Sequence, residues 1–147
     1  MKIIAFDLGK NMSFAHNLNK TPFATHKTFD GTRAERLAST MVWLLAIDWH
    51  HFDACIYETP FARGRDATRC GWGVAGLIEA CASNSCVPVM DAAVSTIKKF
   101  ATGHGKACKE DMVAAAQRFG YKGSNEHEAD AVCLLKYAEA NLERVLK

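Results

Sequence analysis

Short apolar runs alternate along the chain with longer stretches of mixed polarity. Residues 3–6 and 54–57 are entirely apolar or aromatic. Because successive side chains of a strand point to opposite faces, an unbroken apolar run predicts a strand buried on both faces. We predict strands at 2–8, 12–18, 22–30, 53–58 and 87–90. Pro88 lacks the N–H that a central strand donates, so the last strand belongs at a sheet edge.

Helices are predicted where apolar residues recur every three or four positions. Thr32 and Glu35 form a capping-box pattern that opens a helix running to about residue 50. Further helices are predicted at 74–83, 94–101 and 107–118. The last helix begins near Glu126, with Asn125 as its N-cap. Segment 63–73 is rich in arginine and glycine, and we predict a loop there.

The order of these elements predicts the fold class. Three consecutive strands are followed by alternating helices and strands, which is typical of an α/β domain with a mixed sheet: an antiparallel meander plus parallel strands, flanked by helices. A right-handed crossover would place strand 53–58 beside strand 2–8 and parallel to it. At this length, residues 1–147 are expected to form a single domain.

Composition narrows the function classes. The net charge is only +2, so nucleic-acid binding would have to come from a local basic patch. No stretch approaches the roughly 18 apolar residues that span a membrane, and the N-terminal apolar run is too short for a signal peptide. Six cysteines occur without a Cys-x-x-Cys pair, which favours reduced thiols over a zinc site. We therefore expect a cytoplasmic protein.

Three acidic residues stand where predicted elements begin or end. Asp7 and Glu58 each close an apolar run, and Asp130 lies early in the last helix, three residues after His127. Each acid alone is more often structural, as a turn former, an ion-pair partner or a helix cap. Together at strand ends they favour one site for hard cations, because two divalent ions promote phosphodiester hydrolysis. His127 could bind a metal or carry a proton.

Basic residues gather in two segments between Glu58 and Asp130. Residues 95–109 contain four lysines and no acid, with Gly103 and Gly105 allowing close approach of the backbone to a DNA strand. An earlier segment adds arginines, with Trp72 nearby. Such point charges and guanidinium groups suit a phosphate backbone. The basic residues are Arg63, Arg65, Arg69, Lys98, Lys99, Lys106 and Lys109.

In order along the chain, these motifs resemble those of the RuvC family of Holliday-junction resolvases, within the RNase H-like superfamily. Asp7-Leu8-Gly9 is similar to the opening Asp-x-Gly of the family, and Glu58-Thr59-Pro60-Phe61 to its Glu-x-x-Phe. Residues 69–76 resemble the small-residue helix start that follows its junction-contacting loop. The most specific match is the Lys-Lys-x-x-Thr-Gly-x-Gly-x-Ala-x-Lys-Glu run at 98–110. The His-Glu-Ala-Asp-Ala run at 127–131 completes the pattern.

The resemblance implies an RNase H-like fold and a homodimer that cuts two opposed strands of a four-way DNA junction. It implies two Mg²⁺ or Mn²⁺ ions per site, with Asp7, Glu58 and Asp130 as ligands. His127 stands where relatives have a fourth acid or a histidine, so ligand and proton carrier both stay open. Phe61 would stack on a base at the junction centre. We assign catalytic roles to Asp7, Glu58, His127, Asp130 and Lys106, and DNA contacts to Phe61, Arg63, Arg65, Arg69, Lys98, Lys99, Lys106 and Lys109.

Several alternatives stay open at this point. Another RNase H-like nuclease could act on flaps, other branched DNA or RNA-containing duplexes, and a junction-binding protein could carry an inactive site. An actin-like ATPase is excluded, because it needs a second domain that 147 residues cannot hold. The setting fits the cytoplasm of a bacterium or of a bacteriophage-infected host, including a bacteriophage-type member of the family. For a dimer interface, the candidates are the exposed face of helix 74–83 and the side chains of Trp43 and Trp49.

Overall fold

The centre of the molecule is a fully buried strand. The computed structural model describes residues 1–61 and 64–145, with side chains described through residue 142. All five residues of strand β1 (Ile3–Asp7) are buried. It lies between β2 (Asn11–His16), which runs antiparallel to it, and β4 (Ala54–Glu58), which runs parallel to it. The predicted pairing of strands 2–8 and 53–58 is therefore confirmed.

The sheet has five strands in the order β3-β2-β1-β4-β5. Strand β3 (Phe23–Thr28) extends the antiparallel part, and β5 (Val89–Ala92) extends the parallel part. The predicted mixed sheet is confirmed, with β5 at an edge. This strand begins just after Pro88, two residues later than predicted.

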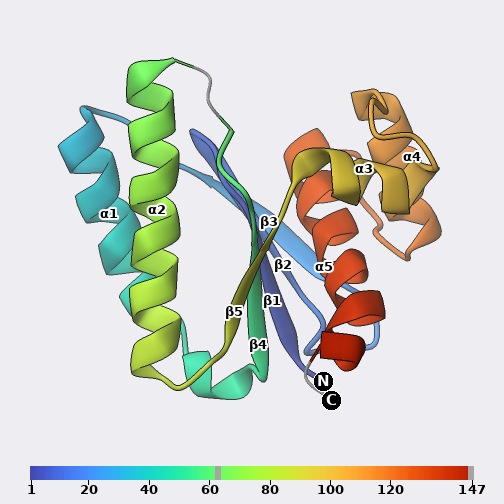
Figure 1. Ribbon diagram of the computed structural model, residues 1–147, viewed down its shortest axis with the longest axis horizontal. Helices are drawn as coiled ribbons and strands as arrows, with labels where there is room; N and C mark the ends of the chain where they lie inside the picture. The colour runs from blue at the N-terminus through green and yellow to red at the C-terminus, as the bar shows by residue number, and fades with distance from the viewer. Residues whose placement is uncertain (62–63, 146–147) are drawn as a thin grey trace.

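Helices cover both faces of the sheet (Figure 1). On one face lie α1 and α2, and on the other lie α3, α4 and α5. Their bounds are α1 Arg33–Leu45, α2 Arg65–Asn84, α3 Val94–Thr102, α4 Lys109–Arg118 and α5 Glu126–Val145.

Helix α1 begins as predicted and ends early. The Glu35 N–H donates to Thr32 Oγ1 and the Thr32 N–H to Glu35 Oε2, so the capping box is formed. The helix ends at Leu45 instead of running to residue 50. The Trp49 indole donates a hydrogen bond of 2.9 Å to the Leu44 carbonyl, which satisfies an acceptor at the helix end. A short 3₁₀ helix, Trp49–His51, follows.

Helix α2 begins at Arg65, so the loop predicted at 63–73 is wrong for residues 65–73. Glycine disfavours a helix in isolation, but here its small size permits close packing. A Cβ on Gly73 would lie 2.9 Å from Leu37 of α1, and one on Gly71 would lie 3.1 Å from Pro60. Tertiary contact therefore overrides local propensity.

The sheet separates two apolar cores. Ile3 and Ala5 of β1 belong to the core under α3, α4 and α5, whereas Ile4 and Phe6 belong to the core under α1 and α2. By the same alternation, Asp7 falls on the α5 side.

Of the two tryptophans proposed for a dimer interface, Trp49 is only 4% exposed, so that part of the prediction is wrong. Trp43 is partly buried and packs edge-on against Phe6. Trp43 and the exposed face of helix 74–83 stay predictions for an interface.

Candidate functional site

Two of the predicted acidic residues end neighbouring parallel strands. In the register of β1 and β4, Phe6 pairs with Tyr57, so the next residues along are Asp7 and Glu58. Ala5 and Ile56 both belong to the core under α5, and side chains alternate along a strand. Both carboxylates therefore lie on the α5 side, at the carboxyl ends of the strands, where open sheets build their sites.

The other two predicted residues come from the first turn and a half of α5. The Asn125 side chain accepts hydrogen bonds from the backbone N–H groups of His127 and Glu128, at 3.0 and 3.1 Å, which confirms the predicted N-cap. His127 and Asp130 are three residues apart, so they share one face of the helix. This cap fixes where α5 begins, and hence where both side chains reach the ends of β1 and β4.

His127 is held by a polar chain from the antiparallel part of the sheet. Its Nε2 lies 3.4 Å from Asn11 Nδ2, and the Oδ1 of Asn11 accepts a 2.8 Å hydrogen bond from Thr28 Oγ1. Because Thr28 occupies the Asn11 oxygen, the amide nitrogen is the group that faces the imidazole. Asn11 therefore orients His127, a role that no local motif revealed.

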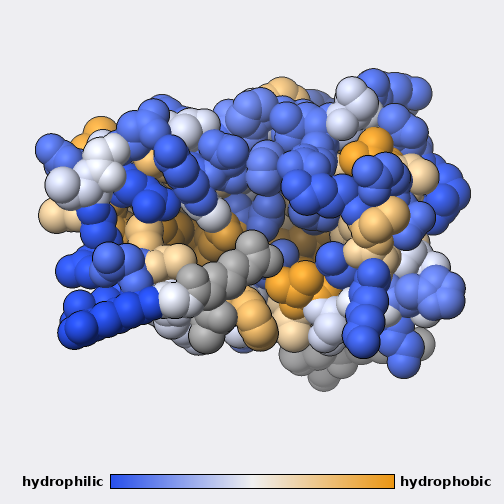
Figure 2. Space-filling view, turned by 90° about the horizontal axis from the view of Figure 1, so that it is seen from above, coloured by the Kyte–Doolittle hydropathy of each residue, from blue (hydrophilic) through white to orange (hydrophobic). Residues whose placement is uncertain are grey.

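The four side chains line one cleft of about 480 Å³. Figure 2 looks onto this end of the molecule, where hydrophilic residues cover both flanks and apolar surface shows in the hollows between them. The cleft runs from α1 and α2 across the ends of β1 and β4 to α3, α4 and α5. Its acidic and basic lining residues are Asp7, Lys10, Arg36, Glu58, Lys98, Lys109, Glu126, His127 and Asp130.

The electrostatics of Asp130 differ from those of a surface carboxyl. Burial raises its pKa, because the charged form loses solvation; the nearby Lys98 and His127 act in the opposite direction. The carboxylate is thus held in a place that penalises its charge. Perturbed groups in clefts are candidates for functional sites.

The predicted lysines divide into two kinds. Lys98 and Lys109 line the cleft, whereas Lys99 and Lys106 are not among its lining residues; Lys98 is half-buried and the other three are exposed. Lys98 Nζ donates to the Ala107 carbonyl at 2.8 Å, and Lys109 Nζ donates to Glu126 at 2.5 Å, which raises the pKa of Lys109. The structure does not bring Lys106, predicted to be catalytic, to the carboxylates. Sequence spacing alone could not separate the two kinds.

The predicted aromatic and arginine contacts among the described residues are exposed, and of these Phe61 lines the cleft. Phe61 lines the cleft and is 70% exposed, unusual for a side chain of this type. Arg65 and Arg69 are exposed near the start of α2, and Trp72 on the same helix is half exposed. Arg63, for which a DNA contact is predicted, lies outside the described residues.

Ligating geometry for a metal is not present within 1–61 and 64–145. No three His, Cys, Asp or Glu side chains in those ranges lie close enough together to hold one ion. The structure brings Asp7, Glu58, Asp130 and His127 to the same cleft without converging on one point. Because carboxylates repel one another, these side chains would come closer together only with a cation between them. The ligand set stays a prediction.

The chemistry of the donors nevertheless fits a hard divalent cation. Three carboxylates and an imidazole offer oxygen and nitrogen ligands, and Mg²⁺ prefers oxygen. Ser13 pairs with Asp7 across β1 and β2, is fully buried, and its Oγ has no hydrogen-bond partner among the described residues. A buried hydroxyl without a partner calls for an explanation such as a bound ion or water. Its position beside Asp7 agrees with a polar ligand there.

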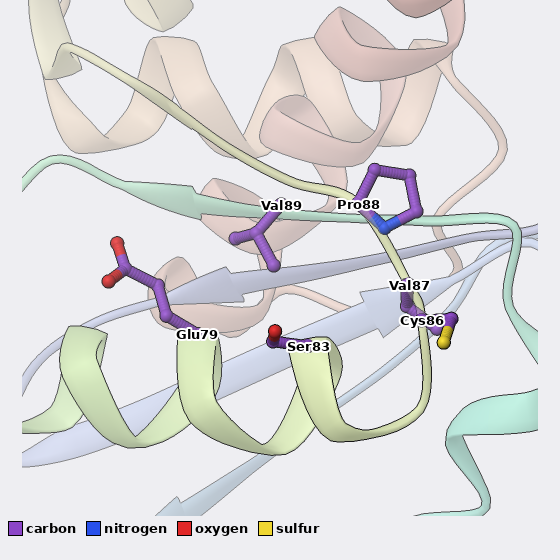
Figure 3. Close-up of a pocket in the computed structure, with 6 residues that line it drawn as sticks. All are labelled: Glu79, Ser83, Cys86, Val87, Pro88 and Val89. Carbon is purple, nitrogen blue, oxygen red and sulfur yellow. The ribbon is translucent and has the colours of Figure 1, made fainter.

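A second hollow, of about 410 Å³, lies between α2 and the segment that leads into β5 (Figure 3). Glu79 and Ser83 of α2 face residues 86–89 across it. Glu79 accepts a hydrogen bond from Tyr57, and none of the described residues that line the hollow is basic. This hollow does not suit a nucleic-acid backbone.

Across the described part of the chain, no helix is long and apolar enough to cross a membrane.

No protein-family model and no curated protein matches the chain. Among solved structures, it is similar to Thermus thermophilus RuvC, with 18% sequence identity and a TM-score of 0.74 over 99% of this chain and 97% of that one. It is also similar to T. thermophilus RuvC in complex with a Holliday junction substrate, with 19% identity and a TM-score of 0.78 over 99% and 96% of the two chains. Identities this low establish the architecture alone. The chain has the RNase H-like fold of RuvC, as the sequence resemblance implied.

Proposed function

We propose that this protein is a metal-dependent DNA endonuclease that resolves four-way junctions by cutting two opposed strands. One observation carries the proposal: carboxylates from β1, β4 and α5 share a single cleft with Lys98 and Lys109. Acids for a cation beside cations for a phosphate are what phosphodiester hydrolysis requires. The fold supports it, since the similar RuvC structure was solved with a Holliday junction substrate.

The carboxylates of Asp7, Glu58 and Asp130 would hold two Mg²⁺ or Mn²⁺ ions. When bound, such ions activate the attacking water and stabilise the leaving oxygen. Lys98 and Lys109 would orient the scissile phosphate through its non-bridging oxygens, because each ammonium group is a compact donor at the cleft wall.

Two roles for His127 are compatible with its position. As a ligand it would use Nε2, the nitrogen that faces Asn11. As a proton carrier it would accept a proton at the same atom. Substitution by aspartate, which binds metal but lacks the imidazole, separates the two roles. A His127→Asp variant that keeps wild-type activity would favour the ligand role, whereas one that still binds metal and junction but cuts slowly would favour the proton carrier.

Selectivity for branched DNA would come from the entrance of the cleft. Phe61 exposes most of its ring, and an exposed aromatic ring can stack on a base that has lost its partner at the junction centre. The exposed Arg65, Arg69, Lys99 and Lys106 would contact the phosphates of the arms.

Paired cuts require two active sites, so we propose a two-fold homodimer that presents both clefts to one junction. The substrate would be DNA of a bacterial or bacteriophage-infected cytoplasm, and residues 1–147 would act as one nuclease domain.

A labelled synthetic four-way junction tests the proposal. With Mg²⁺ or Mn²⁺, we expect symmetric nicks in opposed strands on a denaturing gel, and none in EDTA. Binding without metal-dependent nicks would indicate an inactive junction-binding protein. Faster cleavage of RNA–DNA hybrids than of junctions would support the alternative of another RNase H-like nuclease.

A further inference from the structure

Arg36 is a basic residue of the cleft that no motif marked. It lies in the first turn of α1 and lines the cleft together with Phe61 and Gly71. Its Nε is enclosed by protein and has no hydrogen-bond partner among the described residues. Neighbouring groups are otherwise engaged: Glu35 closes the capping box, and the nearby Arg33 pairs with Asp66.

Two features make this position costly without an anion. A guanidinium N–H removed from water without an acceptor loses solvation and gains no bond. A cation in the first turn also faces the positive end of the helix dipole, which disfavours it. An anion in the cleft that accepts from the terminal N–H groups of the guanidinium would offset the cost set by the helix dipole.

The position of Arg36 complements that of the cleft lysines. Helix α1 covers one face of the sheet, whereas α3 and α4, which carry Lys98 and Lys109, lie on the other (Figure 1). The strand ends with Asp7 and Glu58 lie between them, and all five side chains line the same cleft. A DNA strand that crosses the carboxylates would therefore meet cations on both flanks.

We propose that Arg36 binds a backbone phosphate of the DNA strand on the flank of the cleft opposite Lys98 and Lys109. This inference rests on the proposed function. The planar guanidinium can donate two parallel hydrogen bonds to one phosphate, a geometry that lysine cannot reproduce. Arg36 would thereby fix the path of the strand over the carboxylates.

The test measures the affinity for a synthetic four-way junction, in EDTA, at several salt concentrations. The proteins are the wild type, Arg36→Gln, Arg36→Lys and Arg33→Gln, each checked for its melting temperature. We expect Arg36→Gln to bind more weakly and to lower the salt slope by about one. Arg36→Lys should keep the slope but bind more weakly than the wild type. Arg33→Gln, from the same helical turn but outside the cleft lining, should change the slope less than Arg36→Gln.

Replacing single phosphates of the junction with neutral methylphosphonates then locates the contact. At the phosphate that Arg36 contacts, neutralisation should weaken junction binding by the wild type. The same neutralisation should have little effect on junction binding by Arg36→Gln, because that variant has already lost the contact. If Arg36→Gln does not fold, Arg36→Lys should show a reduced loss at that same phosphate. The role of Arg36 would be overturned by a folded Arg36→Gln variant with an unchanged salt slope. It would also be overturned if, at every phosphate, neutralisation weakened binding of the folded variant as much as binding of the wild type. A wild type that does not bind the junction would overturn the proposed function itself.

Discussion

The floor of the cleft and its rim are built from different kinds of structure. The floor consists of Asp7, Glu58 and Asp130, and two of these end strands of the buried parallel pair β1 and β4. By the rim we mean the exposed residues predicted to contact DNA, Phe61, Arg65, Arg69, Lys99 and Lys106, which are carried by loops or helix surfaces; of these five, Phe61 alone lines the cleft. A rigid core can hold catalytic groups in place, whereas exposed side chains can adapt to a large, deformable ligand. The comparison predicts that substitutions in the floor reduce the rate of cleavage, whereas substitutions in the rim reduce the affinity for the junction.

The largest effect is expected for Asp7→Asn. The substitution keeps the size of the side chain but removes a charge that a cation requires, so cleavage should fall at least about 1,000-fold. Binding of the junction should persist. Asp91→Asn is the matched control: Asp91 is an exposed acid on the next parallel strand and does not line the cleft. Equal losses in the two variants, measured in single-turnover assays, would refute the assignment of the floor.

A smaller effect should separate the lysines. Lys98 lines the cleft and its neighbour Lys99 is exposed. Loss of a charged hydrogen bond to the phosphate is worth about 1.5–3 kcal/mol, so Lys98→Met should slow cleavage about 10- to 100-fold. Lys99→Met and Lys106→Met should mainly reduce the salt slope of binding, by about one each. A cleavage defect in Lys106→Met as large as that in Lys98→Met would support the predicted catalytic role of Lys106.

The rim aromatic gives a prediction about selectivity. Stacking of a base on an aromatic ring is worth about 1–3 kcal/mol, so Phe61→Ala should weaken junction binding by roughly 5- to 100-fold. Fully paired duplex has no unstacked base, and its affinity should change less. Phe61→Trp should restore junction binding. The prediction fails if Phe61→Ala weakens junction and duplex binding equally.

The smallest effect concerns the stability of the floor itself. Because burial raises the pKa of Asp130, its charged form destabilises the folded state above that pKa, and the penalty disappears as pH falls toward the unfolded value. In EDTA, Asp130→Asn should therefore melt at a higher temperature than the wild type at pH 7. The gap should narrow on acidification through the raised pKa. A variant that is less stable at pH 7 would contradict the burial argument.

Local sequence patterns predicted much of this architecture. The unbroken apolar runs located β1 and β4 because both faces of these strands are covered, and the capping groups of Thr32 and Asn125 located two helix starts. The start of α2 was missed because Gly71 and Gly73 are favourable only through their contacts with Pro60 and Leu37. Such contacts between distant segments leave no local pattern.

The same distinction applies to the site. Residues at strand ends, Asp7 and Glu58, were predictable because a carboxylate after a buried run is unusual. Which lysine faces the cleft was not predictable, since it depends on how α3 and α4 pack on α5. Asn11 and Arg36 were missed for a related reason: the residues that surround them, His127 for Asn11 and the cleft lining for Arg36, come from other elements of the folded chain.

A supercoiled plasmid that extrudes a cruciform tests the central claim most directly, because it separates paired from single cuts. With Mg²⁺ or Mn²⁺, two cuts within one binding event convert the plasmid straight to the linear form. We predict linear product from the earliest times, abolished by EDTA and by Asp7→Asn. Accumulation of nicked circles without early linear product, or cutting that persists in EDTA, would contradict metal-dependent paired cleavage at this site.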